Sequence, residues 1–126
     1  MLLYRRWAMR AQIENSIQRS IVAYLRTVVR DCVVMAIPNA ARRTINGKPM
    51  NAAPGLLPGA PDLVIAFPGG KVLWLEVKAP KGVVSDNQVL VHERLGEIGH
   101  TVYIVRSIDD VKEVIQKLNI TTREKQ

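Results

Sequence analysis

Two apolar segments joined by a turn signal constrain the fold of this chain more than any other part of it. Leu63–Phe67 and Val72–Lys78 are rich in the aliphatic and aromatic residues that favour β-strands. Pro68-Gly69-Gly70 separates them, and proline presets φ while glycine accepts a positive φ. The sequence therefore predicts two strands of one sheet joined by a tight turn.

Charged residues stand at one end of this predicted hairpin. Side chains alternate along a strand, so Glu76 and Lys78 are expected on the same face. Asp62 precedes the first strand, and the turn should return the chain so that Asp62 lies beside Glu76. Clustered carboxylates repel each other and lose solvation, which is costly unless a cation lies between them. The sequence therefore predicts a cation site at this end of the sheet.

The order of these residues also resembles a known signature. The chain reads Pro58-Gly59-Ala60-Pro61-Asp62-Leu63 and then Glu76-Val77-Lys78. This resembles the PD-(D/E)XK nuclease motif, and the fuller form is similar to the VRR-NUC branch and to small Holliday-junction resolvases. A bare D…ExK match is weak, because acidic and basic residues alternate on many solvated strands. Here the preceding Val72-Leu73-Trp74-Leu75 is too apolar for an exposed strand, which favours the functional interpretation.

We expect Asp62 and Glu76 to hold one or two Mg²⁺ or Mn²⁺ ions, with the Val77 backbone carbonyl as a further ligand. Lys78 is expected to orient the attacking water or to stabilise charge that develops on the phosphate oxygens. One cysteine and two histidines cannot assemble a Cys/His zinc set, so oxygen ligands are the expected donors.

A first helix is predicted from about Ala11 to Val29, because apolar residues recur there at helical spacing: Ile13, Ile17, Ile21, Leu25 and Val28. We expect this stripe to be buried, and Glu14 lies at its edge. The helix dipole alone would favour a glutamate in the first turn. The family resemblance implies instead that a first-helix glutamate reaches the metal site, often through water.

A second helix is predicted to begin after Ser85 and to run to about Ile98, with Gly99 following it. Ser85 and Gln88 have the spacing of a capping box. One face of this helix is expected to pack on the sheet with Gln88, Val91, Leu95 and Ile98. The resemblance implies another role for Gln88, beside the catalytic lysine. We expect that one conformer cannot fill both roles.

The charge balance favours a polyanionic partner. The chain carries 18 Lys and Arg against 11 Asp and Glu, for a net charge of +7. Aromatic residues are only 5%, so contact with backbone phosphates is favoured over base stacking. Residues 39–58 read as a long loop, and Arg42, Arg43 and Lys48 make it a candidate DNA contact, as does Lys81 after the hairpin. A solvated loop without a ligand is the alternative.

The remaining predicted elements are a first strand at Cys32–Ile37, a fourth strand at Thr101–Arg106 and a last helix capped by Ser107. The expected fold is a single α/β domain over residues 1–126, with a polar tail from about 120. Its order is α-β-β-β-α-β-α, with a mixed four-stranded sheet flanked by helices. The last two strands should be parallel through a right-handed crossover. This order is similar to the PD-(D/E)XK core.

The sequence and the resemblance together predict a metal-dependent DNA endonuclease acting on branched DNA such as four-way junctions, as a homodimer. The alternatives are a non-catalytic or partner-dependent DNA-binding module and a nuclease for linear or flap DNA. No apolar run has the length of a membrane span, and arginines interrupt the N-terminal segment where a signal peptide needs an apolar core. A cytoplasmic protein is therefore expected.

Overall fold

The computed structural model describes residues 2–38 and 54–123. Its elements, in chain order, are α1 (Leu2–Val28), β1 (Val33–Ala36), β2 (Leu63–Phe67), the 3₁₀ turn η1 (Pro68–Gly70), β3 (Lys71–Val77), α2 (Asp86–Glu97), β4 (Val102–Val105) and α3 (Ile108–Lys117). The predicted α/β fold and its order of elements are confirmed. None of the helices in the described part of the chain is long and apolar enough to cross a membrane.

The four strands form one mixed sheet in the order β1-β2-β3-β4. The first three strands run antiparallel, and β3 and β4 are parallel. In the central hairpin Leu63 pairs with Leu75 and Phe67 pairs with Lys71. Gly69 and Gly70 have φ of 80° and 76°, which a side chain would strain. The turn therefore depends on these two glycines, as predicted.

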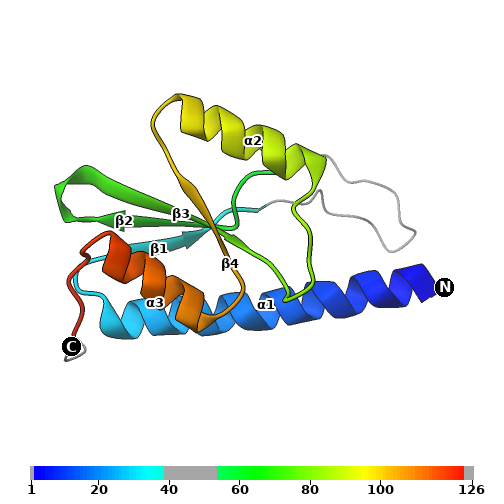
Figure 1. Cartoon of the computed structure of the whole chain (residues 1–126), viewed down its shortest axis with the longest axis horizontal. Helices are drawn as coiled ribbons and strands as arrows, with labels where there is room; N and C mark the ends of the chain where they lie inside the picture. The colour runs from blue at the N-terminus through cyan, green and yellow to red at the C-terminus, as the bar shows by residue number, and fades with distance from the viewer. Residues whose placement is uncertain (1, 39–53, 124–126) are drawn as a thin grey trace.

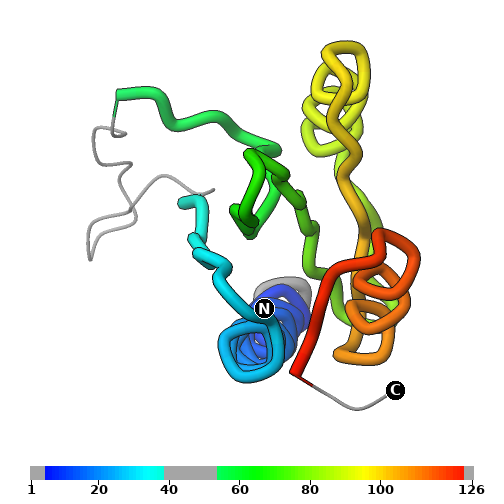
Figure 2. Tube along the Cα trace, turned by 90° about the vertical axis from the view of Figure 1, so that its left-hand side faces the viewer, coloured from blue at the N-terminus to red at the C-terminus, as the bar shows by residue number. Residues whose placement is uncertain are grey.

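Helices cover both sides of the sheet. Figures 1 and 2 show α1 and α3 side by side on one side and α2 on the other. On β3 the alternate residues Leu73, Leu75 and Val77 belong to the core shared with α1 and α3. The other members of that core with least exposure are Ile21, Leu25, Leu63, Ile65, Val105, Val111 and Ile115. The intervening residues of β3, including Glu76, therefore face α2.

Some predicted boundaries and core positions were wrong. Helix α1 begins at Leu2 rather than near Ala11, because the added residues are mostly good helix formers and include no breaker. Its N-terminal half extends past the sheet in Figure 1, and Ile13 is 43% exposed as a result. Ile98 is also exposed, at 73%, because it lies beyond the last turn of α2.

Candidate active site

The backbone on both sides of Asp62 is held by neighbouring strands. The Asp62 N–H donates to the Leu75 carbonyl at 3.0 Å, and its carbonyl accepts from the Ile37 N–H at 2.9 Å. The carboxylate Oδ2 accepts from the Val77 N–H at 2.7 Å. Asp62 is thereby fixed at the end of the hairpin next to Glu76, as predicted. The Val77 carbonyl stays a predicted ligand.

Glu76 is the most deeply buried charged residue of the site, with no exposed surface. Its Oε2 accepts from Gln88 Nε2 at 3.1 Å, and its Oε1 lies 2.9 Å from His92 Nε2. Burial raises the pKa of Glu76 from 4.5 to about 9, and the neighbouring Asp62 carboxyl and then Glu14 add to that rise. Lys78 acts in the opposite direction but is outweighed. A carboxyl that resists ionisation is the expected sign of an uncompensated acidic cluster.

Lys78 follows on the same side of the sheet and is 7% exposed. Its backbone N–H donates to the Val105 carbonyl at 3.0 Å, which extends the pairing of β3 with β4. The ammonium is close enough to lower the pKa of both Glu76 and His92. No residue of the described chain hydrogen-bonds this ammonium or pairs with it. A buried cation without such a partner is suited to an anionic ligand.

Gln88 takes part in the helix cap and in the site at once, through a contact with Glu76 that the sequence did not predict. Its Oε1 accepts from the Ser85 N–H at 2.9 Å, and its own N–H donates to Ser85 Oγ at 3.2 Å, which completes the predicted capping box. Its Nε2 meanwhile donates to Glu76. The two ends of one amide serve the helix and the site together. The hydrogen bond goes to Glu76 and not to Lys78.

His92 is a site residue that the sequence analysis missed. It lies four residues after Gln88 and therefore on the same side of α2, directed at the same carboxylate. Burial and then the charge of Lys78 lower the pKa of His92 below its usual 6.5. Its contact with Glu76 is therefore a hydrogen bond of a neutral imidazole at neutral pH. The other histidine, His100, accepts from Trp74 Nε1 at 3.0 Å and does not join the site.

Close packing behind the site explains one glycine of the motif. Gly59 has φ of +91°, and a side chain there would overlap with the Asn87 carbonyl and lie 2.9 Å from the Gln88 backbone nitrogen. The segment that carries Asp62 can thus approach the start of α2 only because residue 59 is glycine. This contact sets the distance between Asp62 and the helix that presents Gln88.

Glu14 reaches the site from α1. Its Oε1 accepts from the Ala79 N–H at 3.4 Å, at the start of the loop that follows β3. A side chain on Gly82 would come within 3.3 Å of the same oxygen. The structure therefore brings Glu14 close to the Asp62 and Glu76 cluster, where its charge contributes to the raised pKa of Glu76. Its role toward a metal ion remains a prediction.

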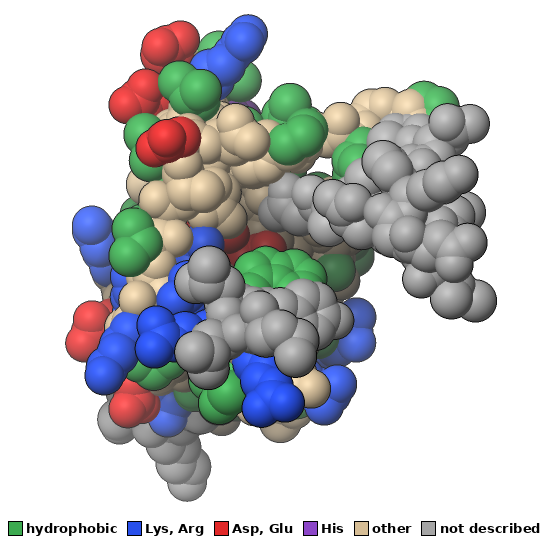
Figure 3. All heavy atoms as spheres, turned by 90° about the vertical axis from the view of Figure 1, so that its right-hand side faces the viewer, with side chains coloured by type: hydrophobic (Ala, Val, Ile, Leu, Met, Phe, Trp, Pro, Cys, Tyr) green, Lys and Arg blue, Asp and Glu red, His purple; other side chains and the backbone are tan. Residues whose placement is uncertain are grey.

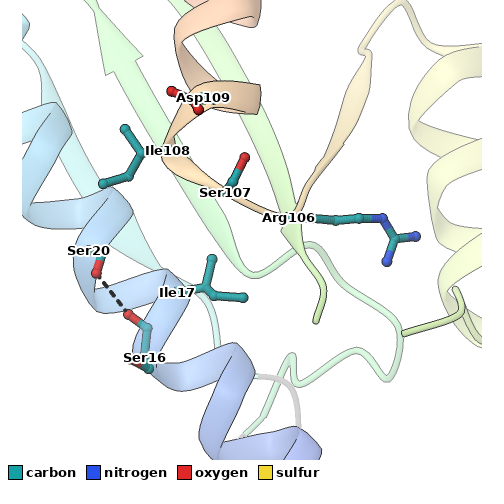
Figure 4. A pocket seen from close by; sticks show the side chains of 7 residues that line it. All are labelled: Ser16, Ile17, Ser20, Arg106, Ser107, Ile108 and Asp109. Carbon is teal, nitrogen blue, oxygen red and sulfur yellow. Dashed lines mark hydrogen bonds between the residues drawn. The ribbon is translucent and has the colours of Figure 1, made fainter. Parts of the chain in front are cut away.

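Arg106 is a second residue that the sequence analysis missed. Its Nη1 donates to the carbonyls of Ala79, Pro80 and Gly82 at 2.6, 3.3 and 2.8 Å. Figure 4 shows a pocket at the end of β4, lined in part by Ser16, Ser20 and Ser107, with the Arg106 guanidinium pointing away from these serines. The guanidinium instead holds the loop that follows β3. No sequence motif marks this role.

The predicted DNA contacts are only partly described. Lys81 is exposed on the loop that follows β3. Arg42, Arg43 and Lys48 lie outside the described residues. Figure 3 shows acidic side chains set back in a recess on the face beyond the N-terminal end of α1, with Lys and Arg side chains gathered nearby.

Comparison with known proteins adds three findings. The family model of the VRR-NUC domain matches residues 5–109. A protein of Acyrthosiphon pisum secondary endosymbiont phage 1, named "Putative nuclease p44", is 34% identical over 61 residues, which cover 48% of this chain and 64% of that protein. The chain thus matches less than two thirds of that relative's length. A solved structure described as a VRR_NUC domain is similar with a TM-score of 0.51 and 22% identity, covering 85% of this chain and 94% of the other.

Proposed function

Because this chain belongs to the VRR-NUC domain family, we propose that it is a nuclease that hydrolyses phosphodiester bonds in DNA with a divalent metal ion. One observation carries the proposal. Asp62, Glu76 and Lys78 converge at one end of the sheet, and the buried Lys78 ammonium forms no hydrogen bond or close ion pair with a described residue. A scissile phosphate beside a metal ion supplies the anion that this cation lacks.

The residues of the site fit Mg²⁺, which takes part of its ligands from water and substrate, better than a metal ion whose ligands all come from the protein. In the described part of the chain no three His, Cys, Asp or Glu side chains are gathered to hold a metal ion. Mg²⁺ does not need such a set, because it is commonly bound by one or two carboxylates, water and substrate phosphates. Asp62 and Glu76 provide the carboxylates, and the raised pKa of Glu76 indicates a site that a cation would relieve. Glu14 and the Val77 carbonyl are further candidate ligands.

When bound, the ion would polarise the scissile phosphate and lower the pKa of a bound water. The protein groups then have separate tasks. Gln88 and His92 hold the Glu76 carboxylate in one orientation through its two oxygens. Lys78 offers its ammonium to charge developing on the phosphate oxygens. The Val77 N–H fixes Asp62 in the same way that α2 fixes Glu76.

Branched DNA as the substrate and a homodimer as the working unit complete the proposal. One site cuts one strand at a time, whereas a twofold dimer matches the symmetry of a four-way junction. The structure offers an apolar surface that would suit such contact. A groove of about 810 Å³ is lined mainly by apolar side chains, and Leu57, Leu90 and Ile98 in it are more than half exposed. Trp7, in the N-terminal half of α1, is also exposed, at 66%.

The test is incubation of the protein with labelled four-way junction, flap, duplex and single-stranded DNA, with Mg²⁺ or with EDTA. We expect cleavage only with the metal and fastest cleavage of the junction, as paired symmetric nicks. Light scattering should give twice the 14.1 kDa chain mass. Binding without cleavage of any of these DNAs would support a non-catalytic DNA-binding module instead. A monomer that cuts linear duplex as fast as the junction would refute the dimer and the branched substrate.

A further inference from the structure

A groove of about 380 Å³ lies between the N-terminal half of α1 and the loop that follows β3. We call it the basic groove; its lining residues are Arg6, Met9, Arg10 and Ile13 from the helix and Ala79, Pro80, Lys81 and Gly82 from the loop. Its described lining residues include three cationic side chains and no acidic one. Its charge is therefore opposite to that of the neighbouring active site.

The basic groove lies next to Glu14, which approaches the active site from α1. Glu14 follows Ile13 in the helix and accepts from the Ala79 N–H at 3.4 Å, so the same two segments meet at the acidic cluster. Arg6, Arg10 and Glu14 are four residues apart, which places them on one side of α1 at intervals of about 6 Å. A strand lying along the groove would therefore reach the active site without leaving the protein surface.

The cations of the groove are available to a ligand. Arg6, Arg10 and Lys81 are all exposed. Within residues 2–38 and 54–123, no carboxylate forms an ion pair with any of the three. Arginine is the side chain best suited to phosphate, because its planar guanidinium can donate two parallel hydrogen bonds.

Apolar side chains line the space between these cations. Met9 is 62% exposed and Ile13 is 43% exposed, although both are large hydrophobic residues. Ile13 was expected in the core and lies in the groove instead. Cations interleaved with apolar surface match the sugar–phosphate backbone of a nucleic acid, whose charged phosphates alternate with less polar sugars.

The loop side of the groove is already held in place. Arg106 binds the carbonyls of Ala79, Pro80 and Gly82, on both sides of Lys81. The Gly82 N–H also donates to the Ala79 carbonyl at 2.9 Å. The backbone that carries Lys81 is therefore ordered before any ligand binds, which lowers the entropy cost of binding.

We propose that the basic groove binds one strand of the DNA substrate through its phosphates, with Arg6, Arg10 and Lys81 as the contacts, and guides that strand into the active site. This inference rests on the proposed nuclease function. It assigns DNA binding to the N-terminal half of α1, in addition to the predicted contact at Lys81.

The test is the salt dependence of DNA binding, measured by fluorescence anisotropy with labelled duplex, single-stranded and junction DNA in EDTA, which prevents metal-dependent cleavage. The variant is Arg6→Gln with Arg10→Gln. The control is Arg19→Gln with Arg26→Gln, which removes the same charge from exposed arginines on the opposite side of α1. Because each phosphate contact contributes about 0.9 to the slope of log K against log salt for duplex, the groove variant should lose about 1.8. For a single strand the expected loss is about 1.4.

We expect the control to keep the wild-type slope and the groove variant to weaken binding about tenfold at low salt. Lys81→Gln should reduce the slope by about half as much as the double variant. Equal slopes for the groove variant and the wild type, or equal losses in the groove variant and the control, would overturn the proposal while leaving the nuclease function intact. A wild-type protein that binds none of the DNAs would overturn both.

Discussion

Replacing Glu76 with glutamine should stabilise the metal-free protein while it abolishes cleavage. Glu76 has no exposed surface, and burial beside Asp62 raises its pKa from 4.5 to about 9. In the unfolded chain the carboxyl ionises near its ordinary pKa. The native protein without a cation must therefore hold a proton on Glu76 at neutral pH, which costs stability. Glutamine has nearly the same shape as glutamate and is neutral at every pH, so folding does not have to keep a proton on it.

The sign of the pKa shift gives the direction of the change in stability with pH, and the two pKa values give its size. A group whose pKa is raised by folding contributes stability below its unfolded pKa and loses that contribution as the pH rises toward its folded pKa. Between about pH 7 and about pH 8.5 the unfolded chain has lost this proton and the native protein keeps it, so wild-type stability should fall by about 2 kcal/mol. His92 has a lowered pKa, so its contribution is fully present above pH 6.5 and is lost as the pH falls from 6.5 through its folded pKa, below this interval. Cys32 has a pKa raised above 9.0 and also lies outside this interval.

The assay is urea unfolding in EDTA at several pH values across that interval. We expect the wild-type free energy of unfolding to decline with pH and the Glu76→Gln value to stay nearly flat. Glu93→Gln, which changes an exposed glutamate of α2, should retain the wild-type decline. Mg²⁺ should restore stability at high pH to the wild type and not to Glu76→Gln. Parallel pH profiles for the wild type and Glu76→Gln would show that Glu76 does not have a raised pKa in the native protein.

Two further predictions concern the packing around Glu76. Gln88→Glu keeps the capping geometry at Ser85 but cannot donate a hydrogen bond to Glu76. Cleavage should therefore fall by about 10–100-fold and require a higher Mg²⁺ concentration. The helix content measured by circular dichroism should stay unchanged. Wild-type activity in that variant would show that the Gln88 contact with Glu76 has no function. Gly59→Ala places a methyl group against the Asn87 backbone and should lower the free energy of unfolding by more than about 1 kcal/mol. An unfolding midpoint equal to that of the wild type would contradict the packing described here.

The hairpin and its charged end could be predicted from the sequence because their causes are local. Strand alternation and a Pro-Gly-Gly turn decide where Asp62 and Glu76 lie relative to each other, and both follow from adjacent residues. The capping box at Ser85 is local in the same way. These features place the acidic cluster and the start of α2 without reference to the rest of the fold.

The residues that were missed depend on contacts between distant segments. His92 can be identified as a site residue only once Glu76 is known to face α2. Its four-residue spacing from Gln88 places both on one side of the helix, as for many residue pairs without a functional role. Arg106 contacts backbone carbonyls, which leave no pattern in the sequence. Ile13 shows a related limit, since helical periodicity predicts which side of α1 is apolar but not how far the sheet covers it.

We propose that the buried ammonium of Lys78 serves catalysis and not the stability of the fold. Lys78→Met keeps most of the side-chain volume and removes a buried charge that no described residue pairs with. The most direct test is single-turnover cleavage of a four-way junction in Mg²⁺ by the wild type and Lys78→Met, at protein concentrations that saturate the DNA. We predict a rate about 10²–10³-fold lower for the variant, with an unfolding free energy at least equal to that of the wild type. Cleavage by folded Lys78→Met at the wild-type rate would show that the Lys78 ammonium has no catalytic role.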